Sequence, residues 1–401
     1  MEKYGIRFHI FPYICCMIQR KAQEKLIQLS QSFKIVAVIG PRQSGKTTLV
    51  KATFPYKTYV SLENLDNRAF AEEDPRGFLE TYQKGAIFDE IQRVPKLFSY
   101  LQEILDNSTE KGLFILTGSN NFLLQENISQ TLAGRLGYLS LLPFSYEELN
   151  IDDKTDNQWM FDGFYPPVYD QEISPTDWYS NYIKTYLERD VRQIKNINNL
   201  LVFDKFLRIL AGRTGQELNM TAIGNEVGVS TKTIQSWIGI LVSSFIIYLL
   251  RPYYNNYKKT IVKRPKIYFY DTGVVCSLLR IQNNEQLENY PLRGAIFETM
   301  VISETIKAYT NKGIEPPLYY WRDKTGHEVD LIIDDFDDKK AIEIKSGKTI
   351  LSEWFKKLNY WKKLTSIEKS YIIYAGNQEQ NRSNLTKITN WKKIKSVINK
   401  Q

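Results

Sequence analysis

Cysteine and histidine are scarce in this sequence. Its 401 residues include three cysteines, Cys15, Cys16 and Cys276, and two histidines, His9 and His327. Adjacent cysteines rarely bridge each other, and the three positions do not match the spacing of a metal site. We therefore predict a reduced, cytoplasmic protein without structural disulfides. Because imidazoles are so few, any catalysis must depend mainly on carboxylates and lysines, with or without a metal ion.

A long hydrophobic run is also lacking. The most apolar stretch, FHIFPYICCMI at 8–18, is interrupted by His9 and Pro12. It is far shorter than the ~20 residues that a membrane helix needs, and no small-residue cleavage site of a signal peptide follows it. We therefore predict no membrane association. Translation is expected to start at Met17, because 17–30 has the pattern of an amphipathic helix.

Two segments of the chain contain no acidic residues, whereas acids and bases are mixed elsewhere in the sequence. The segments 251–270 and 381–401 each hold six Lys or Arg and no acid, and the whole chain has 53 Lys and Arg against 45 Asp and Glu, a net charge of +8. This excess mildly favours a polyanionic partner such as nucleic acid and does not prove one. The length predicts two to four domains rather than one core.

What is present in the first 150 residues is an alternation of apolar strands and helices. FKIVAVIG (33–40), GAIFDE (85–90) and GLFILTGSN (112–120) have the composition of buried strands, and helical patterns separate them. One of these helical patterns is 74–83, where Asp74 is the expected cap and Pro75 lies in the first turn. Such alternation predicts a parallel sheet covered by helices on both faces.

The stretch GPRQSGKT (40–47) matches the phosphate-binding pattern G-x-x-x-x-G-K-[ST] between a strand and a helix. Gly40 and Gly45 allow the backbone N–H groups to face phosphate oxygens at a helix N-terminus. Lys46 would reach the β- and γ-phosphates, and Thr47 would ligate Mg²⁺. The residues expected to bind ATP are Gly40, Pro41, Arg42, Gln43, Ser44, Gly45, Lys46, Thr47, Thr48, Asp89, Asn120 and Arg135.

Two carboxylates end the strand GAIFDE. Asp89 suits the Mg²⁺ shell, and Glu90 suits polarisation of the attacking water as a general base. Ser119 and Asn120, at the end of the next strand, could sense the γ-phosphate or hold the water. Arg135 is either an arginine finger for a neighbouring subunit or a surface arginine. For Asp89 and Glu90 the alternative is an exposed strand end or a helix cap.

With these motifs, the chain resembles the AAA-type P-loop ATPases that carry a C-terminal domain of unknown function. The resemblance lies in GPRQSGKTTL, IFDEIQRVP, LTGSNN, LAGR and YLERD, and it extends over nearly the whole chain from Met17. It implies ATP hydrolysis, places Arg42 and Gln43 in the signature loop, and places 188–190 on a helix after the ATPase core.

Residues 218–250 have the pattern of a helix, a tight turn and a second helix. Gly228 is expected to end the first helix and Ser230 to cap the second. The basic, tyrosine-rich 251–270 could form the wing of a winged helix that contacts DNA phosphates. The alternative is a helical module that packs against the ATPase. The residues expected to face outward are Thr231, Lys232, Thr233, Gln235 and Ser236.

Charged residues interrupt two apolar strands near the C-terminus. HEVDLIID contains Asp330, and AIEIKSG contains Glu343 and Lys345 on one strand face. A helix with Glu298, three strands, a helix and a strand are similar in order to the restriction-endonuclease-like PD-(D/E)XK core, with Val329 in place of its proline. Phosphodiester cleavage would need Mg²⁺ on Glu298, Asp330 and Glu343, with Lys345 acting on a water. The alternative is an exposed sheet face with a Glu–Lys pair of little energetic value.

We therefore predict an α/β protein with an AAA-type parallel-sheet domain, a helical and winged-helix middle and a nuclease-like C-terminal domain. The expected function is ATP hydrolysis coupled to action on nucleic acid, in a possible homo-oligomer. The rival is an ATP-dependent regulator or scaffold whose nuclease-like domain is inactive and binds a partner or DNA. The expected segments are 1–16 (extension), 17–150 (ATPase), 151–200 (helical lid or connector), 201–280 (winged-helix-like) and 291–401 (nuclease-like).

Overall fold

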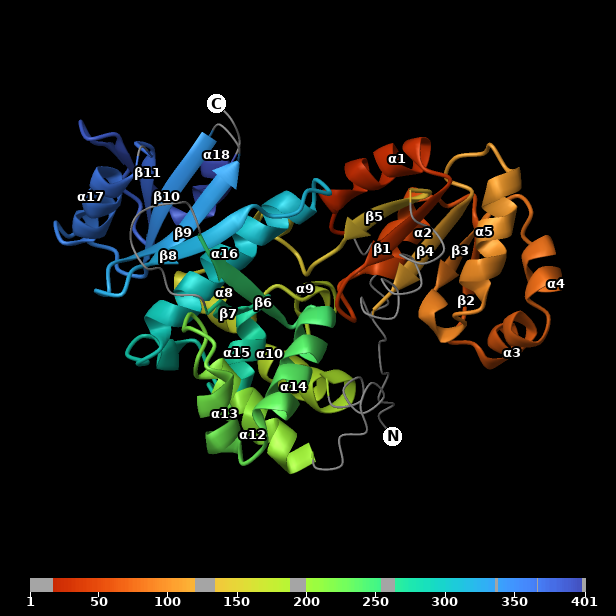
Figure 1. Ribbon diagram of the computed structural model, residues 1–401, viewed down its shortest axis with the longest axis horizontal. Helices are drawn as coiled ribbons and strands as arrows, with labels where there is room; N and C mark the ends of the chain where they lie inside the picture. Colours follow the sequence, from red (N-terminus) through yellow and green to blue (C-terminus); the bar gives the residue numbers. More distant parts are fainter. Residues whose placement is uncertain are drawn as a thin grey trace, which may run out of the picture.

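The computed structural model describes residues 17–119, 134–187, 200–253, 264–335, 338–365 and 367–398. A parallel sheet forms one half of the molecule, a larger mixed sheet forms the other, and a group of helices packs below the mixed sheet (Figure 1). Within the described residues, none of the helices combines the length and the apolar character that crossing a membrane requires.

The first sheet has five strands, and all of their pairings are parallel, as predicted. Alternate residues of β1 enter different cores: Val36 and Val38 pack under α1, while Ile35 and Ala37 pack in the larger core on the other face. Burial on both faces is why these strands are continuous apolar runs. In spatial order the strands are β2 (Thr58–Ser61), β3 (Ala86–Asp89), β4 (Phe114–Gly118), β1 (Ile35–Ile39) and β5 (Leu136–Ser140).

Helices cover this sheet on both sides. The predicted cap of α4 is confirmed, because Asp74 accepts a hydrogen bond from the Gly77 N–H at 3.0 Å and Pro75 begins the helix. The elements of this half are α1 (Ala22–Ser32), α2 (Lys46–Thr53), α3 (Leu65–Glu73), α4 (Pro75–Glu80), a 3₁₀ turn η1 (Ile91–Arg93) and α5 (Leu97–Asn107).

A group of helices follows the first sheet in the chain. α10 continues directly into a π-helical segment, η2, and residues 188–190, which were expected on a helix here, lie outside the described residues. The elements are α7 (Tyr146–Leu149), α8 (Asp156–Asp162), α9 (Pro166–Asp170), α10 (Pro175–Tyr182), η2 (Ile183–Leu187), α12 (Leu200–Ala211), α13 (Met220–Val227) and α14 (Thr231–Ser243).

The helix–turn–helix of α13 and α14 forms as expected. Gly228 ends α13 in the left-handed region at φ 89°, and Ser230 accepts a hydrogen bond from the Thr233 N–H at 3.1 Å. The outward face is smaller than the sequence indicated. Thr231, Lys232 and Gln235 are exposed, but the Ser236 hydroxyl is buried.

The second sheet has eight strands and joins the middle of the chain to its C-terminal part. β6 pairs in parallel with β8 through Arg251 and Tyr319, so the β6–β7 hairpin extends the C-terminal sheet. The spatial order is β12 (Gln380–Asn381), β13 (Thr386–Asn390), β11 (Ser370–Tyr374), β10 (Asp338–Lys345), β9 (Glu328–Asp335), β8 (Leu318–Arg322), β6 (Ile247–Pro252) and β7 (Lys266–Phe269).

The expected order of helix, three strands, helix and strand is present in this half. β8, β9 and β10 are antiparallel neighbours, and β11 returns parallel to β10. The 281–290 segment packs against the core through Leu287, which is fully buried. The helices here are α15 (Thr272–Leu278), η3 (Glu285–Leu287), α16 (Arg293–Thr310), α17 (Trp354–Leu364), η4 (Trp391–Lys393) and α18 (Ile394–Ile398).

Candidate functional site

The loop 40–45 curls tightly between β1 and α2. Gly40 has φ 155°, and a Cβ there would lie 2.0 Å from the Leu141 carbonyl oxygen, so no larger residue fits. Gly45 is left-handed at φ 89° and immediately precedes the helix. The Ser44 hydroxyl is buried and has no hydrogen-bond partner among the described residues. A helix N-terminus with an unsatisfied buried hydroxyl suits an anionic oxygen ligand.

The Lys46 side chain lies over this loop. Its ammonium donates hydrogen bonds to the carbonyl oxygens of Gly40 at 3.0 Å and Pro41 at 2.7 Å, and only 5% of the residue is exposed. The positive charge is therefore held next to the same backbone N–H groups that the sequence assigned to phosphate.

Asp89 lies at the end of β3 in a set of four polar side chains. Its carboxylate accepts hydrogen bonds from the hydroxyls of Thr47 at 3.0 Å, Tyr59 at 2.7 Å and Thr117. Burial, followed by this carboxylate, raises the pKa of Tyr59 well above its ordinary value. Thr47 and Asp89 are thus together, as expected for a Mg²⁺ shell. Tyr59 and Thr117 were missed, because they lie on the neighbouring strands β2 and β4.

Glu90 follows Asp89 in the left-handed conformation, at φ 55°. This turn points the two carboxyl groups in different directions: Glu90 accepts hydrogen bonds from the Ser119 hydroxyl at 3.0 Å and from Gln92. Ser119, expected to sense the γ-phosphate or hold the water, thus lies next to the proposed base, and its role stays a prediction. Asn120, the other predicted residue of that strand end, lies outside the described residues.

A cavity of about 350 Å³ lies beside the loop. One wall is the loop with Asp89 and Glu90, and the other wall comes from α9 and its C-terminal end. Burial raises the pKa of Asp170 in that second wall. The lining residues that the sequence did not suggest are Glu63, Pro166, Pro167, Asp170 and Gln171.

Three other residues that were predicted to bind ATP have different surroundings. The Arg42 guanidinium lies 4.0 Å from the Glu63 carboxylate, and the side-chain amide oxygen of Gln43 accepts a hydrogen bond from the Trp178 indole at 3.2 Å. Arg135 forms an ion pair with Asp106 at 2.7 Å. It directly precedes β5, whereas the loop follows the other end of β1, about 16 Å away along parallel strands. Arg135 is therefore not part of the loop site of its own chain.

The predicted acids of the C-terminal half lie side by side on β9 and β10, but not on an exposed face. Glu343 is fully buried, and Asp330 is only 4% exposed, so the exposed-face alternative is wrong. The Lys345 ammonium lies 2.5 Å from Glu343 and 3.9 Å from Asp330. A second lysine that the sequence analysis missed, Lys357 of α17, lies 3.0 Å and 4.0 Å from the same two carboxylates.

The two carboxylates, Asp330 and Glu343, repel each other, and the two nearby lysines oppose this repulsion. Burial and the nearby Asp330 carboxylate raise the pKa of Glu343 to about 7, against the opposing effect of the two lysines. Although burial lowers the pKa of Lys357, the two carboxylates raise it by more. The Oε2 atom of Glu343 is buried without a hydrogen-bond partner among the described residues, so one carboxylate oxygen remains available to a cation.

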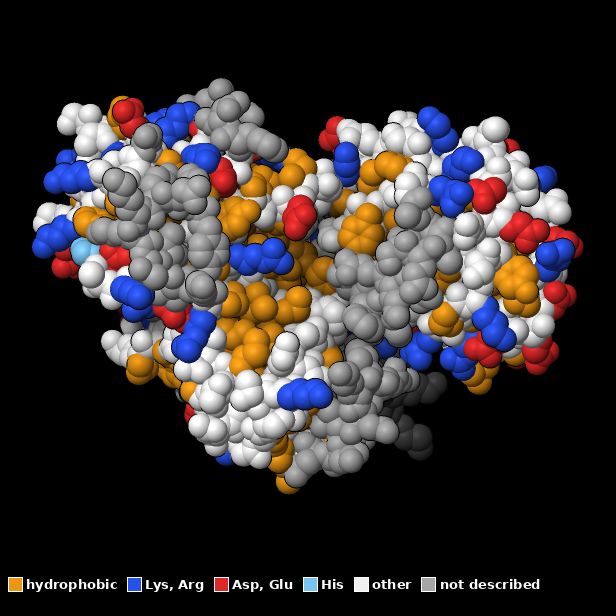
Figure 2. All heavy atoms as spheres, viewed as in Figure 1, with side chains coloured by type: hydrophobic (Ala, Val, Ile, Leu, Met, Phe, Trp, Pro, Cys, Tyr) orange, Lys and Arg blue, Asp and Glu red, His pale blue; other side chains and the backbone are white. Residues whose placement is uncertain are grey.

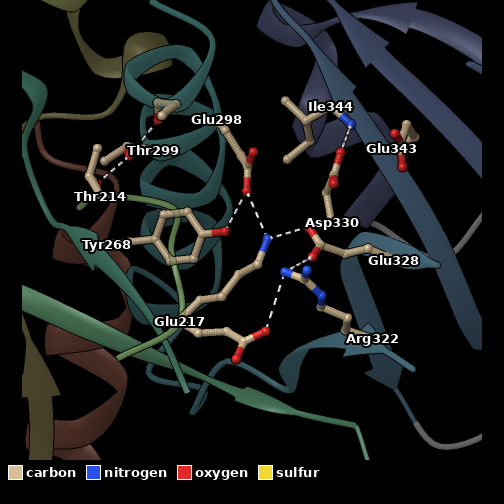
Figure 3. A network of polar contacts seen from close by, with 12 residues as sticks. Thr214, Glu217, Tyr268, Glu298, Thr299, Arg322, Glu328, Asp330, Glu343 and Ile344 are labelled. Carbon is tan, nitrogen blue, oxygen red and sulfur yellow. Dashed lines mark hydrogen bonds and ion pairs between the residues drawn. The ribbon is translucent and has the colours of Figure 1, made fainter. Parts of the chain in front are cut away.

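Glu298 of α16 takes part in a neighbouring network instead. It accepts a hydrogen bond from Tyr268 and lies 3.6 Å from the Lys266 ammonium, which also pairs with Glu328 at 2.7 Å (Figure 3). Asp330 points away from this network and accepts a hydrogen bond from the Ile344 N–H at 2.8 Å. In the described part of the chain, no group of three or more His, Cys, Asp or Glu side chains has an arrangement that could hold a metal ion.

Comparison with protein families matches three parts of the chain. Residues 32–150 match the AAA domain, residues 153–285 match a domain of unknown function (DUF8612), and residues 293–394 match another domain of unknown function (DUF4143). The sheet that carries the loop site thus lies within the residues that match the AAA domain.

Similar curated proteins align over most of the chain. The uncharacterized protein Rv2008c of Mycobacterium tuberculosis is 28% identical over 341 residues, which cover 84% of this chain and 76% of that protein. The uncharacterized protein MJ1544 of Methanocaldococcus jannaschii is 24% identical over 353 residues, which cover 79% and 75%.

Among solved structures, the Walker-type ATPase paby2304 of Pyrococcus abyssi is similar at 15% identity, with a TM-score of 0.45, over 65% of this chain and 95% of that one. A variant of RuvB from Thermotoga maritima is similar at 15% identity, with a TM-score of 0.28, over 57% and 88%.

Proposed function

Because residues 32–150 are an AAA domain, we propose that this chain binds ATP with Mg²⁺ at the loop 40–48 and hydrolyses it. The observation that carries the proposal is the convergence of the loop, the Thr47–Asp89 pair and Glu90 at one edge of the sheet. Ligands of open parallel sheets bind at this edge, beyond the carboxyl ends of the strands.

The donor set fits ATP and Mg²⁺. The Lys46 ammonium lies over the phosphate loop, and the buried Ser44 hydroxyl within the loop has no hydrogen-bond partner among the described residues. The Thr47 hydroxyl and the Asp89 carboxylate are hard oxygen ligands. Bound Mg²⁺ would neutralise charge on the phosphate oxygens. Tyr59 and Thr117 hold Asp89 in one orientation, so the carboxylate is positioned before nucleotide arrives.

Glu90 would act as the general base. Its hydrogen bonds with Ser119 and Gln92 hold the carboxylate beside the cavity, where it can accept a proton from an attacking water. The left-handed turn at this residue separates it from Asp89, so one carboxyl group serves the cation and its neighbour serves the water.

The test of this proposal is Glu90→Gln. The amide cannot accept a proton from water, so we expect ATP binding to remain and hydrolysis to fall by about a hundredfold or more. The matched control is Glu103→Gln, which removes a carboxylate from an exposed ion pair with Arg76 on the same domain. Hydrolysis by Glu90→Gln at the wild-type rate would refute the assignment of the base.

A second candidate function is Mg²⁺-dependent cleavage of phosphodiesters at Asp330, Glu343 and Lys345. The order of α16, β8, β9, β10, α17 and β11 supports it, as does the unpartnered Oε2 atom of Glu343. Two carboxylates would hold the ion, and Lys345 would orient the water. The rival proposal is a domain that binds a partner or DNA without cleavage. It draws support from Lys345 and Lys357, which already balance both carboxylates.

These candidates differ in their products. Incubation with linear duplex DNA and Mn²⁺ should release fragments if cleavage occurs, and Asp330→Ala should abolish the release. Binding without fragments would support the rival. In either case we propose DNA as the partner, through the exposed Thr231, Lys232 and Gln235 of α14 and the basic 251–270 segment, half of which (254–263) lies outside the described residues.

We also propose a cytoplasmic homo-oligomer. Arg135 lies at the edge of the sheet opposite to the loop of its own chain, so it could reach only the nucleotide of a neighbouring copy.

A further inference from the structure

Arg20, just before α1, is buried under the phosphate loop. Its guanidinium donates to the Ser44 carbonyl at 2.6 Å, to the Leu142 carbonyl at 2.6 Å and to the Glu148 carboxylate at 3.1 Å. The guanidinium carbon also lies 4.8 Å from the centre of the Phe144 ring. One planar side chain therefore ties the loop to the segment after β5.

Glu148 is saturated with hydrogen bonds. Besides Arg20, it accepts from the backbone N–H groups of Lys21 and Ser145, both at 2.7 Å, and from the Ser145 hydroxyl at 3.1 Å. A carboxylate held by so many donors fixes the position of the guanidinium that it pairs with.

The turn 144–146 lies in this segment after β5, and α16 of the C-terminal half holds it from the other side. Lys307 donates to the Phe144 carbonyl at 2.8 Å, and Glu304 accepts from the Tyr146 N–H at 2.9 Å. The two side chains also form a buried ion pair at 2.8 Å. α16 extends from the second sheet toward the first, and hydrophobic side chains gather between the two halves (Figures 1 and 2).

We propose that Arg20 is a positioning residue for the phosphate loop and that α16 acts on the loop through the turn 144–146. This inference rests on the proposed binding of ATP at that loop. The Ser44 carbonyl that Arg20 holds belongs to the phosphate loop itself, directly before Gly45 and the start of α2. A shift of the turn therefore moves the backbone N–H groups that would face phosphate.

α16 also carries Glu298, which lies six residues before Glu304, about 9 Å away along the axis, and pairs with Lys266 in the network beside the Asp330–Glu343 pair. A change in the position of α16 would thus reach this network as well as the turn. Linkage requires that any effect of α16 on ATP affinity be matched by an effect of ATP on α16.

The first experiment measures ATP·Mg²⁺ affinity by calorimetry and hydrolysis kinetics in the full chain. Arg20→Lys keeps the charge but replaces three separate guanidinium nitrogens with one ammonium on a shorter side chain, which cannot reach all three acceptors in their present positions. We therefore expect KM and Kd for ATP to rise about tenfold or more, with kcat changing less. The matched control is Lys395→Met. It breaks an exposed ion pair with Glu147 across the same interface, and ATP affinity should stay within about twofold.

The second experiment tests the link to α16. Lys307→Met should raise KM for ATP, and the double variant with Arg20→Lys should raise it less than the product of the two single effects, because both act on one turn. Should Lys307→Met not fold, Glu304→Gln replaces it, since it keeps the size and removes the charge. Hydrogen exchange of α16 peptides should slow when ATP is added to the wild type.

The outcomes distinguish ATP binding at the loop from the positioning role of Arg20 and α16. A wild-type chain that binds no ATP overturns the proposed function and this inference with it. Wild-type binding with normal affinity in Arg20→Lys overturns this inference alone. Multiplicative effects of the two substitutions, with exchange in α16 unchanged by ATP, would show that Arg20 acts without α16.

Discussion

Glu343→Gln should remove a pH dependence from the stability of the C-terminal half. The fully buried Glu343 has a pKa raised from its ordinary 4.5 to about 7, first by burial and then by Asp330. Between these two values the native state binds more protons than the unfolded chain. The contribution of this group to the free energy of unfolding is therefore fully present below pH 4.5 and is lost as the pH rises through about 7.

The size of the effect follows from the two pKa values. Each pKa unit corresponds to about 1.4 kcal/mol, so the wild type should lose about 3 kcal/mol of stability through this group between pH 4.5 and pH 8. The glutamine has no proton to lose, so the variant should lack this component, although it leaves Lys345 and Lys357 with one carboxylate fewer.

The measurement is urea unfolding of the full chain in EDTA at pH 5 and pH 8, followed by tryptophan fluorescence. Trp321 and Trp361, which pack 4.9 Å apart in the core beside α17, report on this half. Glu379→Gln is the control, because that carboxylate is exposed in an ion pair with Lys393. If wild type and Glu343→Gln lose the same stability between the two pH values, within about 1 kcal/mol, the reasoning on Glu343 is refuted.

Four further results are expected. Lys46→Ala should abolish ATP binding in calorimetry, since it removes the cation held over the loop; retained affinity would contradict its role. Lys357→Met should give a larger Mn²⁺-induced rise in melting temperature than the wild type, because it removes a competing cation, and an equal rise would argue against a shared site. Lys345→Ala should keep the Mn²⁺ shift and lose any DNA cleavage, whereas Asp330→Ala should lose both in the same pair of assays. Asp74→Ala should cost about 1 kcal/mol in urea unfolding through the lost cap of α4, and no change would mean that solvent replaces the cap.

Local patterns predicted much of the fold and the loop site. The apolar runs at 33–40 and 85–90 became strands of a parallel sheet, and Asp74 and Ser230 became caps. Thr47 and Asp89, 42 residues apart, came together as predicted, because a motif at one strand end and a carboxylate at another imply the same edge of a sheet. The winged-helix and nuclease-like assignments stay predictions.

Contacts between segments distant in the sequence could not be predicted. Period-two alternation placed Glu343 and Lys345 on one face, but whether that face is exposed depends on α17, which covers it and brings Lys357. Glu298 pairs with Lys266 because the β6–β7 hairpin joins the C-terminal sheet, a pairing that no local signal announces.

By itself, the sequence determined the parts of this protein whose geometry follows from neighbouring residues: the phosphate loop, its flanking strand and helix, and the alternating faces of β9 and β10. Only the tertiary structure decided which charged side chains lie within reach of each other and of their hydrogen-bond partners. Arg20 meets Ser44 and Glu148 because segments far apart in the sequence fold together within the first half. α16 meets the turn at 144–146 because the two halves of the chain pack together. Burial and ion pairing depend on distances in space, and local spacing along the chain does not fix those distances.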